Sequence, residues 1–494
     1  MNLPTTIQIT LLSLGASLVL SVPTSSHAQG PLAPPGAPAP LFKTLEQIEP
    51  RRPISSLPFL INQPGSYYVT ANLVGAAGQN GITINSDCVT LDLMGFELRG
   101  VAGSLSGILL NAGTRAYIYN GCLRNWGQDG ITGTGAGTAS VLERLRVANC
   151  GRDGITTGSG SQVRLCTATG NARNGIVAGN DSDVDDSVSN TSGVRGIQVG
   201  SGSNVRRCIV SANLGSGIVT GDGCSVISCN ANDSGNVANP NATGITVGGG
   251  CTVRDCTTRN NTGNGIQASF GCNVANNSCR DNLGNNIEVS QECLVSQNAC
   301  DDDTSNRGQS GIRVTGNNNR IDHNTATETV RGLWITSADN EVIGNTVLRN
   351  FTNYVIVAGN QLNILLGQIP ETIPWSAHVE LAGTLRSVGA ANGITITTND
   401  VTIDLKGHAL IGVAGSLDGI SVSGSRTNIV IRNGSVRGWG SDGIQAFSSY
   451  NSSFSDLRVS GNGANGLQGG NGAVIKCVTA RGNGADGITT AVAV

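Results

Sequence analysis

The chain has 494 residues, of which 70 are glycine, 3% are aromatic and 13% are charged, and its formal net charge is -3 at pH 7. So few large side chains exclude most ordinary globular cores, whereas a hydrophobic content of 38% excludes wholesale disorder. The near-neutral charge removes the usual argument for a nucleic-acid partner. Short side chains can still form a core when they stack in a regular array, so the composition favours a repeat protein.

The first 44 residues resemble targeting and linker sequence. An apolar run from Ile9 to Val22 is followed by small residues that end at Ala28, which is typical of a secretory signal peptide over residues 1–28. Residues 29–44 are rich in proline and indicate an extended spacer. No later stretch approaches the ~18 consecutive apolar residues of a membrane span. We therefore expect an exported chain that does not span a membrane and is secreted, periplasmic or held at the cell surface.

A short phrase, glycine followed by an apolar residue, recurs through the rest of the chain. The phrase or its equivalent stands at Gly81, Gly107, Gly130, Gly154, Gly175, Gly196, Gly217, Gly244, Gly265, Asn286, Gly311, Gly332, Tyr354, Gly393, Gly419, Gly443, Gly466 and Gly487, mostly at intervals of 21 to 27 residues. Short alternating stretches and polar turns follow each phrase, without a helical stripe. This pattern predicts an all-β solenoid, a parallel β-helix of about 18 coils stacked about 4.8 Å apart. We expect each glycine to turn a corner at positive φ and the next residue to enter the core.

Residues at one offset from successive phrases should stack in columns. Seven asparagines four residues before the phrase predict a hydrogen-bonded ladder: Asn171, Asn213, Asn261, Asn282, Asn350, Asn462 and Asn483. Two cysteine columns lie seven and twelve residues after it, comprising Cys88, Cys224, Cys251, Cys272 and Cys293, and Cys166, Cys208, Cys229 and Cys256. Parallel Cβ directions favour buried thiol stacks, with disulfides between coils and a metal site as the alternatives.

A longer repeat is superimposed on the short one. Residues 80–108 return as residues 392–420, at an offset of 312. The chain therefore divides into one full unit over residues 45–365 and a partial second unit over residues 366–494. The final phrase, GADGITTAVAV, offers no cap for a solenoid, which indicates a truncated sequence.

The stretches ISSLPFLINQPGSYYVTANL and VTLDLMGFELRGVAGSLSGI, together with the coils, resemble the secreted bacterial right-handed parallel β-helix repeat proteins of the pectin-lyase-like group. The resemblance covers essentially the whole mature chain and implies right-handed winding. It implies less about function, because the group includes polysaccharide lyases, hydrolases, epimerases, tailspikes and adhesins. The catalytic triplets of polygalacturonases do not occur, and Asp322 and His323 only echo a pectate-lyase motif, so we interpret them as structural.

One edge of the predicted solenoid carries alternating charges. Arg164, Asp185 and Arg206 share one offset on consecutive coils, with Asp186 and Arg207 beside them. In a lyase or hydrolase such carboxylates could act as acid, base or calcium ligands while arginine holds a uronate. An ion-pair ladder in solvent, of small energetic value, is the simpler interpretation.

Two smaller groups are candidates for binding. Asp301, Asp302 and Asp303 concentrate carboxylates of the kind that hold calcium, although an exposed acidic loop is the favoured interpretation. Trp126 and Trp439 occupy equivalent places in the two units and are candidates for stacking on sugar rings or for covering a corner of the coil.

The residues thus predict shape more sharply than chemistry. Asp92 and Asp404 match between the units, which predicts a shared turn role. The favoured function is a carbohydrate-associated module that binds a polysaccharide or cell-surface glycan. The alternatives are a polysaccharide lyase or hydrolase acting on a charged glycan and a structural or adhesive rod without a ligand. No complete catalytic motif is present, and calcium is the only cofactor that the residues suggest.

Overall fold

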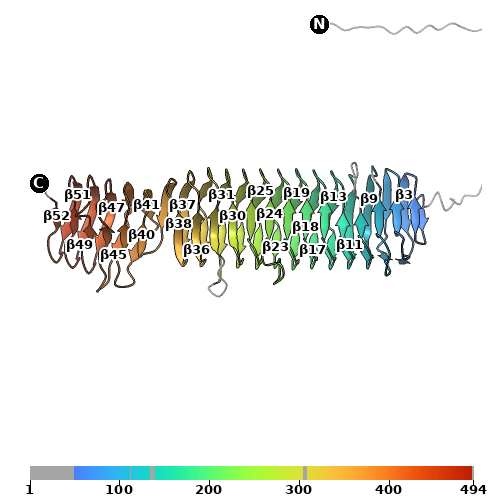
Figure 1. Ribbon diagram of the computed structural model, residues 1–494, viewed down its shortest axis with the longest axis horizontal. Helices are drawn as coiled ribbons and strands as arrows, with labels where there is room; N and C mark the ends of the chain where they lie inside the picture. The colour runs from blue at the N-terminus through green and yellow to red at the C-terminus, as the bar shows by residue number, and fades with distance from the viewer. Residues whose placement is uncertain (1–48, 112, 134–138, 304–308, 492–494) are drawn as a thin grey trace, which may run out of the picture. The chain divides into compact units, whose positions relative to one another are not determined.

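The computed structural model divides the chain into two units, residues 1–50 and 51–494, and it describes residues 49–111, 113–133, 139–303 and 309–491. The predicted signal peptide and spacer lie outside the described residues. Every regular element in the described part of the second unit is a β-strand (Figure 1). No helix that is long and apolar enough to cross a membrane occurs among the described residues.

Most coils of the second unit contain three short strands, and in most of the others the second and third are joined into one longer strand, such as β9 (Ala116–Arg124). In one coil the chain passes through β15 (Ile176–Ala178), β16 (Asp183–Asp185) and β17 (Val188–Asn190) and then reaches β18 (Ile197–Val199). Strand β18 pairs with β15 in parallel, one coil further on. Successive coils repeat this arrangement, so the described part of the unit is a parallel β-solenoid (Figure 1).

The first run of each coil lies in one of two sheets, which together supply twenty strands and therefore twenty coils. The fourteen-stranded sheet runs from β2 (Phe59–Ile61) to β38 (Thr352–Ile356), and the six-stranded sheet runs from β40 (Glu371–Ile373) to β52 (Ile488–Thr490). The other runs form a thirty-two-stranded sheet. The predicted number of coils is thus close. The two that were missed begin at β2 and β40, where the glycine phrase is absent.

The core consists of in-register columns of short apolar side chains. Ile155, Ile176, Ile197 and Ile218 lie above one another in the fourteen-stranded sheet, and each is 0% exposed. Burying such a side chain stabilises the fold by roughly 1.5–3 kcal/mol relative to exposure. The apolar half of the repeated phrase therefore enters the core, as predicted. Tyr354 occupies this apolar column, because it pairs with Leu333, and not the glycine column in which the sequence pattern placed it.

The glycine of the phrase has a different role from the predicted one. Gly154 does not have a positive φ. A Cβ atom there would lie 2.6 Å from the carbonyl oxygen of Gly175 in the next coil and 2.6 Å from Asn171 Nδ2. Glycine is required because the coils approach closely, and not because the backbone turns. The left-handed backbone lies at other corners, for example at Asp186 and Arg207, where φ is 46° and 51°.

The predicted asparagine ladder is present, with backbone groups as its main donors. Asn171 Oδ1 accepts a hydrogen bond from the backbone N–H of Cys150 in the preceding coil, at 3.1 Å. Side-chain amides also bond directly where two asparagines are consecutive, as from Asn261 Nδ2 to Asn282 Oδ1 at 2.8 Å. The ladder thereby satisfies buried groups of the neighbouring coil, although Asn171 Nδ2 has no hydrogen-bond partner among the described residues.

The cysteine columns also take part in hydrogen bonds between neighbouring coils. The backbone N–H of Cys224 donates to Cys251 Sγ at 3.2 Å, and further along this column the N–H of Cys293 donates to Asn319 Oδ1 at 2.8 Å. All fourteen cysteines lie in the described residues, and all carry free thiols. Burial raises the pKa of the Cys166 thiol to about 12, which keeps it protonated and unreactive at neutral pH.

At the boundary between the two sequence units, the thirty-two-stranded sheet continues, whereas the fourteen-stranded sheet ends and the six-stranded sheet begins. Strands β37 (Glu341–Leu348), β39 (Gln361–Leu366) and β41 (Ala377–Leu381) pair in succession, so the thirty-two-stranded sheet crosses the boundary. On the other side, β38 pairs with β36 (Arg331–Ile335) and β40 pairs with β43 (Ile394–Ile396). Within the described residues no backbone pairing joins β38 to β40. The boundary therefore leaves an interruption in the sheet.

Candidate functional site

The edge of alternating charges that the sequence predicts is present in the structure. Arg164 pairs in register with Asp185, and Asp185 pairs in register with Arg206. Arg207 Nε donates to Asp186 Oδ1 at 2.9 Å, and Arg207 also contacts the Asp185 carboxylate. This hydrogen bond from Arg207 holds the pKa of Asp186 below its usual value. The other Asp185 oxygen is buried without a hydrogen-bond partner among the described residues, so it is not open to a ligand.

A carboxylate that the sequence columns did not single out extends this edge. Glu143 accepts hydrogen bonds from the Tyr117 hydroxyl at 2.7 Å and from Arg164 Nη2 at 2.9 Å. Arg144 lies 2.9 Å from its other oxygen. The hydrogen bond from Tyr117 is the largest cause of a lowered pKa at Glu143. The charges of this edge therefore pair with one another, as in an ion-pair ladder.

The acidic run 301–303 does not form a common site. Asp302 is 2% exposed, and its Oδ1 accepts hydrogen bonds from the Asp281 backbone and from Asn286 Nδ2, both at 2.8 Å. Asp302 is thus part of the stacked core and not of an exposed acidic loop. Among the described residues no three His, Cys, Asp or Glu side chains are grouped in a way that could hold a metal ion.

The two tryptophans proposed for sugar stacking are buried. Trp126 and Trp439 are each 1% exposed. Their indole N–H groups donate to the carbonyl oxygens of Leu98 at 3.0 Å and Leu410 at 3.3 Å. A Cβ atom on Gly81 would lie 2.7 Å from the Trp126 ring. Neither ring offers a face to a sugar, because both fill the interior of the coil beneath the glycine column.

The residues that we interpret as structural do have structural contacts. In Asp92 and Asp404, Oδ1 accepts the backbone N–H two residues further on, at 2.8 Å in both cases, which confirms the shared turn role. Asp322 pairs with Arg320 at 3.1 Å and also contacts the His323 ring. His323 occupies a left-handed corner with φ of 52°.

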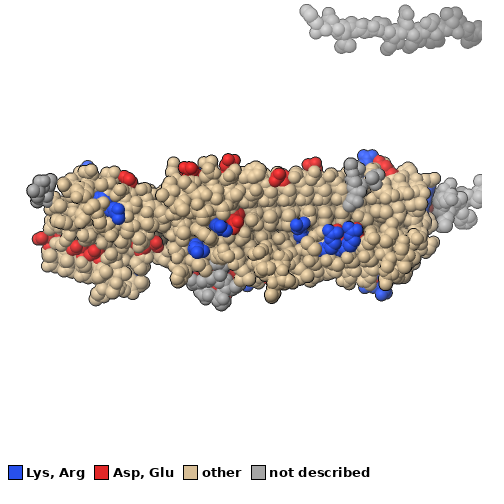
Figure 2. Space-filling model, in the orientation of Figure 1, with Lys and Arg blue, Asp and Glu red and all other residues tan. Residues whose placement is uncertain are grey.

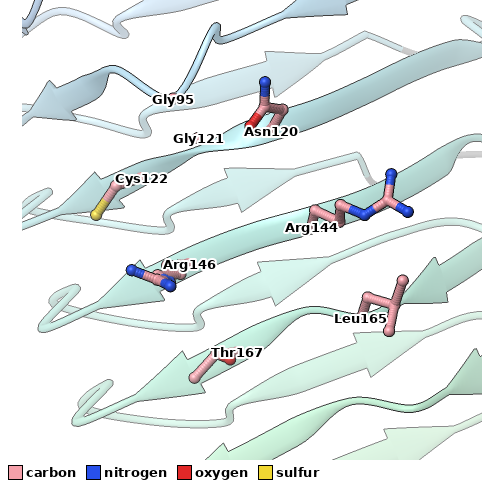
Figure 3. A pocket seen from close by; sticks show the side chains of 8 residues that line it. All are labelled: Gly95, Asn120, Gly121, Cys122, Arg144, Arg146, Leu165 and Thr167. Carbon is pink, nitrogen blue, oxygen red and sulfur yellow. The ribbon is translucent and has the colours of Figure 1, made fainter.

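A corner groove of about 490 Å³ carries two arginines but does not converge on a ligand. It is lined by Gly95, Asn120, Gly121, Cys122, Arg144, Arg146, Leu165 and Thr167. Figure 3 shows that the guanidinium groups of Arg144 and Arg146 point away from each other. Because these guanidinium groups diverge, the groove does not direct two charged donors at one anion.

A more convergent group lies on the outward face of the fourteen-stranded sheet. Gln267, Glu288, Arg313 and Trp334 stand in register on four successive coils. The guanidinium carbons of Arg313 and Arg331 each lie 4.4 Å from the centre of the Trp334 ring. The indole thereby holds two planar cations on a sheet face, in an arrangement stabilised by the ring quadrupole.

Glu288 ties this group to the polar side chains around it. Its Oε2 accepts hydrogen bonds from Asn285 Nδ2 at 2.7 Å and from Arg313 Nη1 at 3.3 Å. Arg313 Nε is buried and has no hydrogen-bond partner among the described residues. Among the described residues, Arg331 has no ion-pair partner. A carboxylate therefore fixes the guanidinium of Arg313, whereas the guanidinium of Arg331 contacts the indole without an ion pair among the described residues.

Two polar grooves flank the column. The first groove, of about 500 Å³, is lined by Asn264 and Gln309. The second groove, of about 470 Å³, is lined by Thr246 and Thr315. Gln267 and Glu288 line both grooves. In Figure 2, basic and acidic atoms lie side by side where Figure 1 places β30 (Asn285–Val289), on a face that is otherwise mostly uncharged. The charged side chains of Glu288 and Arg313 thus lie beside open polar grooves.

Sequence reasoning missed this group although a signal was present. The columns that we considered lie four residues before, seven after and twelve after the glycine. The outward column lies two residues after it, where Gln267, Glu288, Arg313 and Trp334 follow one another in the sequence. Reading that offset would have predicted the cluster.

Comparison with known proteins supports the fold. Residues 195–351 match the family described as "Right handed beta helix region", which confirms the right-handed winding that the resemblance implied. No curated protein matches the chain.

Several solved structures are similar to this chain at low identity. The A-module of the mannuronan C-5 epimerase AlgE6 from Azotobacter vinelandii is 15% identical with a TM-score of 0.48, over 57% of this chain and 90% of that one. The A-module of AlgE4 from the same organism is 16% identical with a TM-score of 0.37, over 60% and 89%. Gene product 12 of bacteriophage phi29 is 12% identical with a TM-score of 0.32, over 86% and 69%. Likenesses of this size say nothing about what the chain binds or catalyses.

Proposed function

We propose that this right-handed parallel β-helix is a glycan-binding module that takes an acidic polysaccharide on the outward face of its fourteen-stranded sheet. The supporting observation is the pair of guanidinium groups, of Arg313 and Arg331, each 4.4 Å from the centre of the Trp334 ring. Stacking on the indole orients the planar cations and leaves N–H edges for carboxylate or sulfate groups. Such hydrogen bonds between charged groups are about twice as strong as neutral ones.

The surroundings favour a polymer over a small anion. Outward-facing glutamines lie along the same column, at Gln198 and Gln267, and each can bond to sugar hydroxyls. The coil spacing of about 4.8 Å is close to the advance of one pyranose unit along an extended chain. A polysaccharide lying along the column would therefore present about one sugar to each coil. This function agrees with the predicted export of the chain.

Catalysis is the alternative. A lyase or hydrolase using Arg164, Asp185 and Arg206 would need carboxylates that are free to act, whereas Arg207 contacts Asp185 in the structure. Among the described residues, Glu288 is the only carboxylate that lines either groove beside the column, while glycoside hydrolysis generally uses a pair. Binding is therefore the better-supported function.

The test is titration calorimetry of the mature protein with a polyuronate and with a neutral polysaccharide of similar length. Arg331→Gln should weaken polyuronate binding at least tenfold, since a tenfold change in Kd corresponds to about 1.4 kcal/mol, within the range of one hydrogen bond to a charged group. Arg254→Gln removes the same charge from the thirty-two-stranded sheet and serves as the matched control. Equal effects of the two substitutions would refute this site. Absence of binding to any polysaccharide would favour the structural rod.

A further inference from the structure

The interruption between β38 and β40 is bridged by side chains in place of backbone pairing. Asn353 Nδ2 donates to Glu371 Oε2 at 3.1 Å, and Trp375 Nε1 donates to the carbonyl oxygen of Ile356 at 2.7 Å. The Trp375 ring also meets Tyr354 edge to face, with centroids 5.8 Å apart. These contacts hold the two strands while leaving the sheet open between them.

Glu371 occupies a position that is apolar in the coils on either side. It pairs in register with Ile394 and so begins the apolar column of the six-stranded sheet, while Tyr354, in register with Leu333, ends the corresponding column of the fourteen-stranded sheet. Burial raises the pKa of Glu371, against the opposing effect of the hydrogen bond from Asn353. A carboxyl group therefore lies in the apolar column at the break in the sheet. Packing alone does not explain a carboxyl group at this position.

A cavity of about 440 Å³ opens at this break. Its walls include the polar side chains of Gln368, Glu371, Asn392 and Thr395, together with Phe351, which is 82% exposed. None of its eleven lining residues is basic. The volume lies within the range of small-molecule sites. An exposed aromatic ring beside a polar cavity is costly to leave in water and is a common feature of binding surfaces.

We propose that this cavity is a second binding site, which takes an uncharged sugar unit. Amide and hydroxyl side chains both donate and accept, as sugar hydroxyls require. The Phe351 ring offers an apolar face to the C–H side of a pyranose. A uronate is disfavoured because the wall supplies a carboxyl group and no cation. The site differs from the Trp334 site in its residues and in its charge preference, so it does not depend on the proposed polyuronate binding.

Neutral oligosaccharides test the proposal directly. Cellotetraose, maltotetraose and xylotetraose are titrated into the mature protein, with calorimetry and intrinsic tryptophan fluorescence as the two readouts. At least one should bind, and Phe351→Ala should weaken that binding at least fivefold. Because the Phe351 ring is exposed, this change should leave the fold intact, and an unchanged circular dichroism spectrum verifies that the variant is folded. Phe270→Ala, at a ring that is 51% exposed on another coil, is the matched control.

The outcomes separate the two sites. Loss of binding in Phe351→Ala with retention in Phe270→Ala and in Arg331→Gln supports the junction site. Binding that survives Phe351→Ala, or an absence of binding to all three oligosaccharides, overturns it. Either result leaves the polyuronate experiment at Trp334 unaffected, because that experiment uses a different ligand and a different variant.

Discussion

Replacing Gly154 by alanine tests the role of the repeated glycine. The added Cβ atom would lie 2.6 Å from the Gly175 carbonyl oxygen, whereas ordinary contact begins at 3.4 Å, so the two coils would have to separate by about 0.8 Å. The backbone N–H groups of Gly154 and Ile155 donate to the next coil at 2.9 Å, and this separation would break or strain both bonds. At about 1 kcal/mol per bond, with added packing strain, we expect a loss of about 2–3 kcal/mol in the free energy of unfolding.

Urea denaturation followed by circular dichroism measures this loss, with Gly389→Ala as the control. A Cβ atom on Gly389 would meet nothing within 4 Å, so that change should be neutral or slightly stabilising. Gly154→Asn distinguishes the two explanations of the glycine. Asparagine tolerates left-handed backbone better than alanine does, but it is larger, so close stacking predicts that it destabilises more than alanine. A milder effect of asparagine, or equal effects at Gly154 and Gly389, would refute the stacking argument.

Three further changes test the core, the thiols and the junction. Trp126→Ala should lower the free energy of unfolding by about 3–5 kcal/mol, because a fully buried ring is lost. Urea denaturation measures this loss, and a change below about 1 kcal/mol would contradict the burial of the ring. Iodoacetamide at pH 8 should alkylate the exposed Cys88 and Cys477 but not Cys150, because burial raises the pKa of the Cys150 thiol to about 12. Mass spectrometry of the native protein identifies the alkylated cysteines, and rapid modification of Cys150 would contradict its burial. Because the folded-state pKa of Glu371 is raised, its protonated form favours folding at low pH, and this contribution should disappear as the pH rises through the folded-state pKa. Glu371→Gln should remove that part of the pH dependence of thermal stability, and an unchanged pH profile in the variant would exclude Glu371 as its source.

The candidate site was only partly predictable, even though its column can be found in the sequence. The offset of two residues after the glycine places Arg313 and Trp334 on adjacent coils and on the outward face. Arg331 stands three residues before Trp334, and no offset rule indicates that its guanidinium folds back over the indole. Equivalence between the units was similarly incomplete as a guide, because it matched Trp126 with Trp439 without indicating that both rings are buried.

The sequence by itself determined the period, the apolar column and the polar ladders. In a solenoid, residues one period apart are neighbours in space, so an offset in the chain translates directly into a contact. Only the tertiary structure decided what depends on how side chains are directed and how closely coils approach. These features are the steric role of Gly154, the stacking of two guanidinium groups on one indole, and the break at which Glu371 enters the apolar column. Each arises from distances between atoms of different coils, which a periodic pattern does not specify.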